Sequence, residues 1–475
     1  MQFQSMNTPT SKPGISRRRF LAVTGAAAVA APTFIPARAL GRDGNTAPSN
    51  RIVMGVVGWG MQAPGNTASL MGFDSCQVVA SCNIDKNHLA ESLRKINEKN
   101  GNEDCKGYHD YREMMARPDI DAVMIAVPDN WHNLIAVEAL NNKKDVYGEK
   151  PLARTIAEQQ GIVRAVQANQ RIWQMGSWQR SQWFFRKAAE IVRNGLIGKV
   201  TEVHVGLPAG HGDFGGSGRE MAQKLGHGND TEYLTKVVPG SPDWDKAISD
   251  PPAELDYETW VGPATMEPYS RARSHMDWRW NYNIGGGQLL DWAGHHIDIA
   301  HWGLGFDLEG PSEIEGHGEF PDRKALWNTS GKYRIEAKYP QDIKMIIAGG
   351  HGDIQSGTKW IGTDGWVHID RDNNFQSSNP DWKDIRNLPD DMAKIRLYKS
   401  DNHAGNFLEC VKSRKPTICP SQVGHHSTIP GHLGLISMLL DGRKIRWSNS
   451  DEVILDDPEA SKLLTREYRA PWKMA

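Results

Sequence analysis

A glycine-rich turn directly after a buried strand constrains this chain more than any other feature. Residues 52–57, Ile-Val-Met-Gly-Val-Val, form an apolar run typical of a parallel sheet, and Gly-Trp-Gly-Met-Gln-Ala follows at once. In this G-x-G-x-x-A pattern the first glycine permits a tight turn, the second admits a pyrophosphate, and the alanine lets a helix pack closely. The pattern predicts a dinucleotide site that includes Gly58, Gly60, Met61 and Ala63.

The end of the next strand bears on the choice of nucleotide. Residues 77–82 are expected to form that strand, and Asn83 ends it, with Asp85 two residues further on. An acidic residue at this position accepts hydrogen bonds from the ribose hydroxyls and repels a 2′-phosphate. Asn83 and Asp85 are therefore candidate cofactor contacts, and the neutral Asn83 leaves NAD and NADP both open.

Two further strand ends carry polar groups. Residues 122–127 form a buried run that ends in Pro-Asp-Asn-Trp-His, and residues 145–148 lead into Glu149-Lys150-Pro151. Ligands of doubly wound sheets gather at such strand ends. A lysine there can donate to a substrate oxygen and stabilise a developing alkoxide, although an isolated lysine at a turn is more often simply exposed. The candidate cofactor contacts here are Val127, Pro128, Asn130, His132, Glu149 and Lys150.

A second constellation lies on a helix predicted from Gln288 onward. Asp291, His295 and Asp298 have the spacing i, i+4, i+7 and share one helix face. A carboxylate on that face can orient the imidazole of His295 and raise its basicity, as a general base requires. A single buried histidine is more often structural, and His296 points about a hundred degrees away, which makes it the less favoured base.

Four motifs follow one another in the chain: the glycine turn, the Pro-Asp-Asn-Trp-His strand end, Glu149-Lys150-Pro151, and the helix with Asp291, His295 and Asp298. Together they resemble the Gfo/Idh/MocA family of glucose-fructose oxidoreductases, inositol dehydrogenases and rhizopine-catabolism proteins. The resemblance extends through residues 174–181, 260–263 and 357–363. It implies an α/β fold with an N-terminal Rossmann domain, followed by a C-terminal α+β domain whose large, open, mostly antiparallel sheet lines the substrate site. Such sheets often make homodimer or homotetramer contacts.

The resemblance also implies residue roles. Matched motif positions make Lys150, Asp291 and His295 the catalytic trio and add Gln179 to the cofactor contacts. His295 would remove a proton from a sugar hydroxyl, Lys150 would steady the charge on the oxygen, and Asp291 would orient His295. The cofactor would be NAD or NADP, which takes up the hydride.

The second half of the chain is expected to bind a carbohydrate. The chain has 17 tryptophans, many of them in that half, and indole rings stack on pyranose faces, although most should be core residues. Residues 206–239 are expected to form a long loop or lid. Gly-Gly-His-Gly at 349–352 is similar to a motif of glycosidases in this superfamily, but a bend in a sheet explains it better. The candidate substrate contacts are Lys150, Arg180, Arg279, Tyr282, Asp291 and His295, with Asn283 and His403 held more weakly.

The first 39 residues have the pattern of an export signal. Ser-Arg-Arg-Arg-Phe-Leu at 16–21 precedes an apolar stretch at 22–34 and a small-residue cleavage pattern at 37–39. This order resembles a twin-arginine signal and predicts a periplasmic protein that is exported after folding. The apolar stretch is shorter than the roughly 20 residues of a membrane span, so stable membrane insertion is not expected. We therefore divide the chain into a signal at 1–39, a linker at 40–50, a Rossmann domain at 51–176 and a substrate-binding and oligomerisation domain at 177–475.

The composition of the chain excludes several classes of binding partner. Lys plus Arg is 55 and Asp plus Glu is 57, so no broad basic field is available for a nucleic acid. The five cysteines are too few and too scattered for a disulfide framework, and none has zinc-ligand spacing, so no metal is expected. The expected partner is a small carbohydrate.

Three functions stay open. The leading hypothesis is an exported NAD(P)-dependent oxidoreductase that acts on a sugar or glycoside hydroxyl and keeps its cofactor, because free nucleotide is scarce outside the cytoplasm. The first alternative is a redox-neutral glycosidase that oxidises its sugar transiently. The second is a sugar-binding protein without catalysis, against which the presence of Lys150, Asp291 and His295 argues.

Overall fold

The computed structural model describes residues 47–475. The predicted signal and most of the predicted linker lie outside the described residues. A short 3-10 helix, η2 (Pro48–Asn50), belongs to the first contact unit, and residues 52–475 form the second, a single compact unit. The predicted domain division at 176/177 falls inside this second unit and stays a prediction. Within the described residues, we find no helix that is both long and apolar enough to span a membrane.

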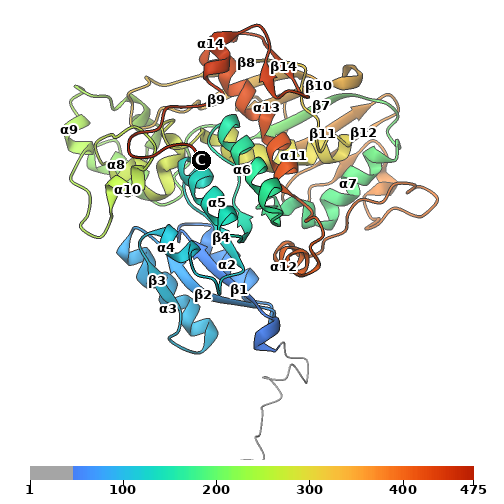
Figure 1. The fold of residues 1–475 in the computed structure, drawn as a ribbon. Coiled ribbons are helices and arrows are strands. Elements are labelled where there is room, and N and C mark those ends of the chain that lie inside the picture. The colour runs from blue at the N-terminus through green and yellow to red at the C-terminus, as the bar shows by residue number, and fades with distance from the viewer. Residues whose placement is uncertain (1–46) are drawn as a thin grey trace, which may run out of the picture. The chain divides into compact units, whose positions relative to one another are not determined.

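The N-terminal sheet is parallel throughout and has the order β3-β2-β1-β4-β5-β6 (Figure 1). This is the order of a Rossmann fold, with the switch point at β1 and β4. The predicted strands at 52–57 and 145–148 are confirmed, whereas the one at 122–127 ends two residues early. The strands are β1 (Ile52–Val57), β2 (Cys76–Cys82), β3 (Lys106–Tyr108), β4 (Ala122–Ile125), β5 (Asp145–Gly148) and β6 (Trp173–Met175).

Helices cover both faces of this sheet. On one face, Met54 and Val56 of β1 pack with Leu70, Ile96 and Phe407, so a helix from late in the chain completes this core. The opposite face packs against α4, α5 and α6. The helices are α2 (Ala63–Leu70), α3 (Lys86–Asn100), α4 (Tyr111–Met115), α5 (His132–Asn141) and α6 (Ile156–Asn169), with the late helix α12 (His403–Ser413) and the 3-10 turn η3 (Asp129–Trp131).

The second sheet has nine strands in the order β13-β12-β11-β7-β10-β9-β8-β14-β15. Only β7 and β10 pair in parallel, which confirms a mostly antiparallel sheet. The strands are β7 (Val200–Leu207), β8 (Glu313–Glu319), β9 (Lys332–Lys338), β10 (Lys344–Gly349), β11 (Gly357–Gly362), β12 (Trp366–Ile369), β13 (Gln376–Ser377), β14 (Ile445–Ser448) and β15 (Val453–Ile454).

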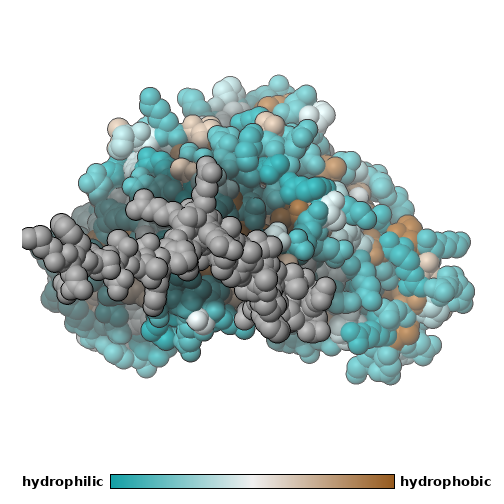
Figure 2. All heavy atoms as spheres, turned by 60° about the horizontal axis from the view of Figure 1, so that its bottom comes forward, coloured by the Kyte–Doolittle hydropathy of each residue, from teal (hydrophilic) through white to brown (hydrophobic). Residues whose placement is uncertain are grey.

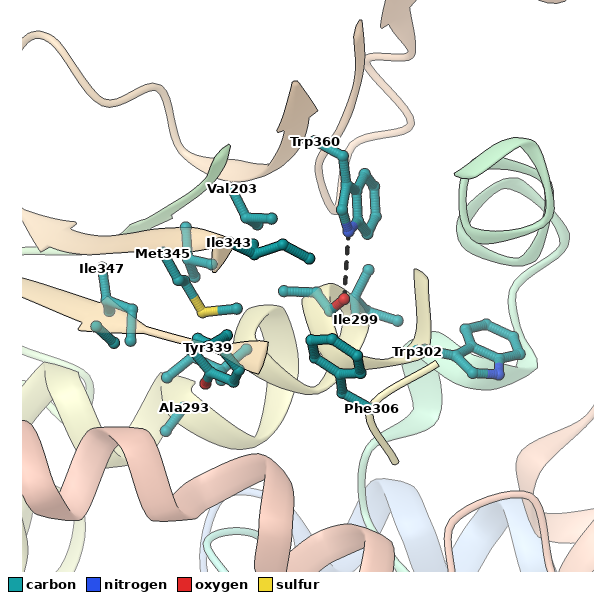
Figure 3. Close-up of a cluster of buried hydrophobic side chains, with 14 of the residues drawn as sticks. Val203, Ala293, Ile299, Trp302, Phe306, Tyr339, Ile343, Met345, Ile347 and Trp360 are labelled. Atoms are coloured by element: carbon teal, nitrogen blue, oxygen red, sulfur yellow. Dashed lines mark hydrogen bonds between the residues drawn. The ribbon is translucent and has the colours of Figure 1, made fainter. Parts of the chain in front are cut away.

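Three long helices, α7 (Trp183–Arg193), α11 (Gly287–Leu304) and α13 (Ser421–Leu439), pack on one face of this sheet (Figure 1). Figure 3 shows the core between α11 and the strands, where the Trp360 indole donates a hydrogen bond of 3.2 Å to the Ala300 carbonyl. The same strands carry charged side chains on their other face, where Arg334 and Lys344 both pair with Glu336. Packing against the sheet and the neighbouring helices therefore holds α11, which contains the predicted catalytic residues Asp291 and His295, in a fixed position.

The expectation of a long loop or lid at 206–239 is wrong. Gly206 still belongs to β7, and the segment contains α8 (Ser217–Lys224) and the 3-10 helix η5 (Thr231–Lys236). Leu225, Leu234 and Val237 pack with buried Trp280 and Trp327 in a small core of their own. Some of the glycines and polar residues that suggested a loop, such as Gly206, His211 and Gly218, are themselves buried in this packed segment.

Short helices complete the chain. Gly349 ends β10 and Gly350 follows with φ +81°, so this glycine pair makes the expected bend. All five cysteines are buried and unpaired. The remaining elements are α9 (Trp244–Ala247), α10 (Tyr257–Val261), α14 (Pro458–Lys462), η4 (Trp178–Ser181), η6 (Arg271–Arg273), η7 (His275–Trp280), η8 (Pro340–Asp342) and η9 (Pro380–Trp382).

The surface visible in Figure 2 is mostly hydrophilic, with hydrophobic residues in small separate groups. Two of the large apolar side chains that remain exposed, Met61 and Phe214, line the cavity described below.

Candidate active site

A cavity of about 760 Å³ lies at the carboxyl ends of β1, β2, β4 and β5 and extends to α11. This volume is in the range of small-molecule and cofactor sites. Of the residues predicted from the sequence, the lining includes Gly58, Gly60, Met61, Asn83, Asp85, Val127, Pro128, Glu149, Lys150, Arg279, Asp291 and His295. One cavity thus joins the predicted cofactor turn to the predicted catalytic trio.

The turn after β1 fits a dinucleotide. Gly58 has φ +89°, and a side chain there would lie 2.2 Å from the Ala126 carbonyl oxygen, so only glycine is possible. A Cβ on Gly60 would meet no atom within 4 Å, which leaves the backbone open to a pyrophosphate. Ala63 is buried at the start of α2 and does not line the cavity, in keeping with a packing role.

The end of β2 is occupied by local hydrogen bonds. Asn83 Oδ1 accepts from the Asp85 amide at 2.9 Å, and Asp85 Oδ1 caps α3 by accepting from the amides of Asn87 and His88. Potential metal-ligand atoms of Asp85, His88 and His275 lie within 4.8 Å of one another. The absence of a metal stays a prediction.

Besides Ala63, three of the predicted cofactor contacts lie outside the cavity lining, namely Asn130, His132 and Gln179. His132 has a backbone carbonyl near each ring nitrogen, Pro151 at 2.7 Å and Val127 at 3.0 Å. Asn130 donates to the Val261 carbonyl at 2.8 Å. Both side chains are buried and hold loops together, so their expected contact with the cofactor is not supported. Glu149, which does line the cavity, accepts from Asn66 Nδ2 at 2.6 Å.

The catalytic candidates Lys150 and Asp291 form a buried ion pair. Lys150 Nζ lies 2.9 Å from Asp291 Oδ1, and Arg279 Nε lies 3.0 Å from the same oxygen. Burial alone would raise the pKa of Asp291, but the charges of Lys150 and Arg279 outweigh it and hold that pKa well below its usual range. Asp291 therefore stays ionised and fixes both cations.

His295 has a different partner from the one expected. Its Nδ1 lies 2.8 Å from Gln179 Oε1, whereas Asp291, on the same helix face, points to Lys150 and Arg279. An amide oxygen at Nδ1 accepts the proton of that nitrogen and leaves the lone pair on Nε2. Burial, with the positive charges of Lys150 and Arg371, holds the pKa of His295 well below its usual value. The imidazole is therefore neutral near pH 7, as a base must be.

The third residue of the predicted helix face, Asp298, is structural. Its carboxylate accepts two hydrogen bonds from Arg180, at 2.7 and 2.9 Å, and Arg180 also binds Asp307 at 2.7 Å. Arg180 is 2% exposed and does not line the cavity, so the expectation that it contacts the substrate is not supported.

Tyr282 and the two weaker candidates also lie elsewhere. Tyr282 and Asn283 line a separate cavity of about 460 Å³, where the guanidinium groups of Arg154 and Arg323 lie over the Tyr282 ring. His403 is buried between Ser181 Oγ and the Met175 carbonyl. These positions do not support the expected substrate contacts.

Several cavity residues were missed, and two of them are charged groups close to the catalytic candidates. Asp129 lines the cavity, and burial, with the charge of Asp291, raises its pKa to about 7. It lies at the strand end that drew attention to Asn130 and His132, so the same rule could have found it. Arg371 follows β12 and also lines the cavity, but no sequence pattern connects it with the catalytic residues.

A late segment of the chain forms another part of the cavity wall. Trp472 lines the cavity, makes an edge-to-face contact with Trp131 at 4.8 Å between ring centroids, and has the Arg112 guanidinium over its ring. Arg469 anchors this segment by donating to the carbonyls of Glu258 and Gly262.

Comparison with known proteins agrees with this architecture. Residues 52–177 match the family model described as oxidoreductase family, NAD-binding Rossmann fold, and residues 243–474 match that of the oxidoreductase family, C-terminal alpha/beta domain. The chain is 33% identical over 152 residues to an inositol 2-dehydrogenase of Salmonella typhimurium, a match covering 32% of this chain and 44% of that relative. It is 30% identical over 174 residues to glycosyl hydrolase family 109 protein 2 of Shewanella sp. ANA-3, covering 33% and 38%. The chain thus spans less than half the length of these relatives.

Solved structures show a similar fold. The aldose-aldose oxidoreductase of Caulobacter crescentus aligns with a TM-score of 0.57 at 16% identity, covering 83% of this chain and 99% of that one. The myo-inositol 2-dehydrogenase of Lactobacillus plantarum aligns with a TM-score of 0.53 at 17% identity, also covering 83% and 99%.

Proposed function

Because the chain belongs to the Gfo/Idh/MocA family of oxidoreductases, we propose that it oxidises a hydroxyl of a sugar or glycoside to a ketone with NAD or NADP. The observation that carries the proposal is that Lys150, Asp291 and His295 line the same cavity as the Gly58 turn. A bound nicotinamide supplies the two-electron acceptor.

The residues divide the proton chemistry between them. His295 Nε2 accepts the hydroxyl proton, because Gln179 holds Nδ1 and the imidazole is neutral. Lys150 donates a hydrogen bond to the same oxygen and stabilises its charge as the carbonyl bond forms. Asp291 positions Lys150 and Arg279, not His295. The hydroxyl proton thus leaves on His295 while the carbon loses its hydride.

The direct test is the nucleotide content and absorbance spectrum of protein purified without added cofactor, before and after addition of a panel of sugars. We expect stoichiometric NAD or NADP that becomes reduced with a subset of the sugars, and the released nucleotide identifies the cofactor. Lys150→Met is the matched variant: it should keep the nucleotide and lose the reduction. A protein without nucleotide affinity would contradict the proposal, and a Lys150→Met variant as active as the wild type would remove Lys150 from the mechanism.

The proposal includes export by the twin-arginine route and retention of the cofactor in the periplasm. The order of arginine pair, apolar stretch and small-residue pattern in residues 16–39 supports it. A retained cofactor needs a second substrate that takes the hydride back. We further propose a homodimer or homotetramer, and the face of the second sheet opposite the helices is the surface available to it.

A redox-neutral glycosidase is the second candidate, and the similarity to the glycosyl hydrolase family 109 protein favours keeping it. It predicts cleavage of aryl glycosides without added cofactor. Failure across several sugar configurations, with nicotinamide reduction intact, would leave the oxidoreductase.

A further inference from the structure

Arg371 contributes a positive charge to the cavity, and its guanidinium has no ion-pair partner in the part of the chain that the structure describes. It follows β12 and lines the cavity together with His295. Its guanidinium lies 5.0 Å from the ring centroid of Trp178 and 4.8 Å from that of Trp292. Among residues 47–475, no side chain or carbonyl makes a hydrogen bond or an ion pair with it. Cation–π contacts use none of the five N–H donors, so these stay available to a ligand.

Arginines with a structural role look different in this chain. Arg180 has carboxylate oxygens of Asp298 and Asp307 at 2.7 to 2.9 Å, which satisfies its charge. Arg279, in the same cavity as Arg371, is bound to Asp291. Burial lowers the pKa of Arg371, and the charges of Asp291 and Asp372, neither of which forms an ion pair with it, offset this only in part. A partly buried guanidinium in this state gains free energy from an anionic ligand.

The charges around the catalytic residues also favour an anionic ligand at Arg371. Lys150 and Arg279 share the carboxylate of Asp291, and Arg371 adds a further positive charge near His295. Lys150 and Arg279 thus have a carboxylate partner, whereas a neutral sugar would leave Arg371 without one. The indoles of Trp178 and Trp292 line the same part of the cavity, and the indole surface that Arg371 and His296 leave uncovered is available to a pyranose ring.

We propose that the substrate is a sugar acid and that Arg371 binds its carboxylate, with the ring against Trp178 or Trp292. This deepens the proposed function and rests on it. A carboxylate matches the planar fork of a guanidinium with two parallel hydrogen bonds, which a hydroxymethyl group cannot do. Arg371 is thus a specificity residue rather than part of the proton transfer.

The test compares hexuronic acid glycosides with the neutral hexosides of the same configuration, which differ only in the carboxylate. One readout is reduction of the bound nicotinamide, and the other is calorimetric binding to Lys150→Met, which needs no turnover. We expect the wild type to prefer the uronide, and Arg371→Gln to lose roughly 10-fold to 150-fold of its activity on the uronide relative to its activity on the hexoside. Arg371→Lys should recover only part of the loss.

Arg386→Gln is the matched control, because that guanidinium also lies over an indole, Trp183 at 5.4 Å, but does not line the cavity. Arg386→Gln should change the activity on neither the uronide nor the hexoside. An unchanged nucleotide content verifies that each variant folds. Equal losses on uronide and hexoside in Arg371→Gln would overturn the proposal, as would a wild type that prefers hexosides or sulfated or phosphorylated sugars. If no sugar reduces the nicotinamide, the proposed function fails, while calorimetry still decides whether the cavity selects the uronide.

Discussion

Two acidic residues in one cavity have pKa values shifted in opposite directions. Asp291 is held ionised by Lys150 and Arg279, whereas burial and the charge of Asp291 raise the pKa of Asp129 to about 7. Near pH 7 Asp291 is therefore a carboxylate, whereas Asp129 is present in both its protonated and its ionised form. The protonation of Asp129 thus changes in the working range of an enzyme.

This difference predicts a pH-dependent stability for Asp129→Asn. The folded state binds the Asp129 proton more tightly than the unfolded state, so the wild type loses free energy of unfolding as pH rises from about 4 to about 7, at most about 1.4 kcal/mol per pH unit. Asparagine removes that loss. We expect the Tm of the variant, relative to the wild type, to be higher near pH 8 than near pH 5 by thermal melting. A difference independent of pH would show that Asp129 does not titrate as inferred.

Gln179 holds the proposed base, His295, in the tautomer that leaves the lone pair on Nε2. Gln179→Leu removes the acceptor of the His295 Nδ1 proton, and we expect kcat to fall roughly 10² to 10⁴-fold with KM little changed. Gln179→Glu restores an acceptor and adds a negative charge, which favours the imidazolium. Its acid limb in the pH profile of kcat/KM should therefore move to higher pH. An unchanged profile in both variants would assign Gln179 a packing role only.

At the scale of elements, the buried Arg180 pair joins η4 to α11. Arg180→Ala leaves Asp298 buried without a counter-charge, and we expect a loss of about 3 to 5 kcal/mol in free energy of unfolding. Arg180→Met with Asp298→Leu should recover much of that loss. Denaturant unfolding measures it, and Arg386→Gln, at an exposed arginine, is the control that should unfold like the wild type. A stable Arg180→Ala with weaker sugar binding would reinstate the substrate role.

The two glycines of the turn after β1 make a matched pair. Gly58→Ala places Cβ against the Ala126 carbonyl at a positive φ, so we expect poor folding. Gly60→Ala meets no protein atom within 4 Å, so it should fold with an unchanged Tm and bind nucleotide at least 10-fold more weakly, roughly the effect of 1.4 kcal/mol. Thermal melting and nucleotide titration separate the two effects. Normal affinity in Gly60→Ala would mean that the pyrophosphate does not approach there.

Elements were more predictable than side-chain partners, for a physical reason. The strands at 52–57 and 145–148 and the glycine turn follow from local apolar runs and backbone geometry. Helical spacing correctly placed Asp291 and His295 on α11, but their partners Lys150, Arg279 and Gln179 arrive from three other segments. Local periodicity contains no information about such contacts. The prediction of a long loop at 206–239 failed for the same reason, because the small core of this segment depends on contacts with the distant Trp280 and Trp327.

At the scale of the whole molecule, the leader is expected to decide where the protein works. Replacing Arg17 and Arg18 with lysines keeps the charge but should abolish export through the twin-arginine route. We expect the wild type in the periplasmic fraction and the variant in the cytoplasmic fraction, and both should contain bound nucleotide. Fractionation followed by nucleotide analysis checks both. Export of the variant would point to another route.

The wall that contains Trp472 is also the last part of the cavity to be synthesised. A ribosome delivers the turn at Gly58 first, the helix with His295 much later, and Trp472 after both. A dinucleotide that has settled on the turn is then enclosed by a segment that arrives behind it and is fastened by Arg469. We therefore expect the nucleotide to bind more readily during synthesis than afterwards, so that each molecule keeps the nucleotide that it first binds.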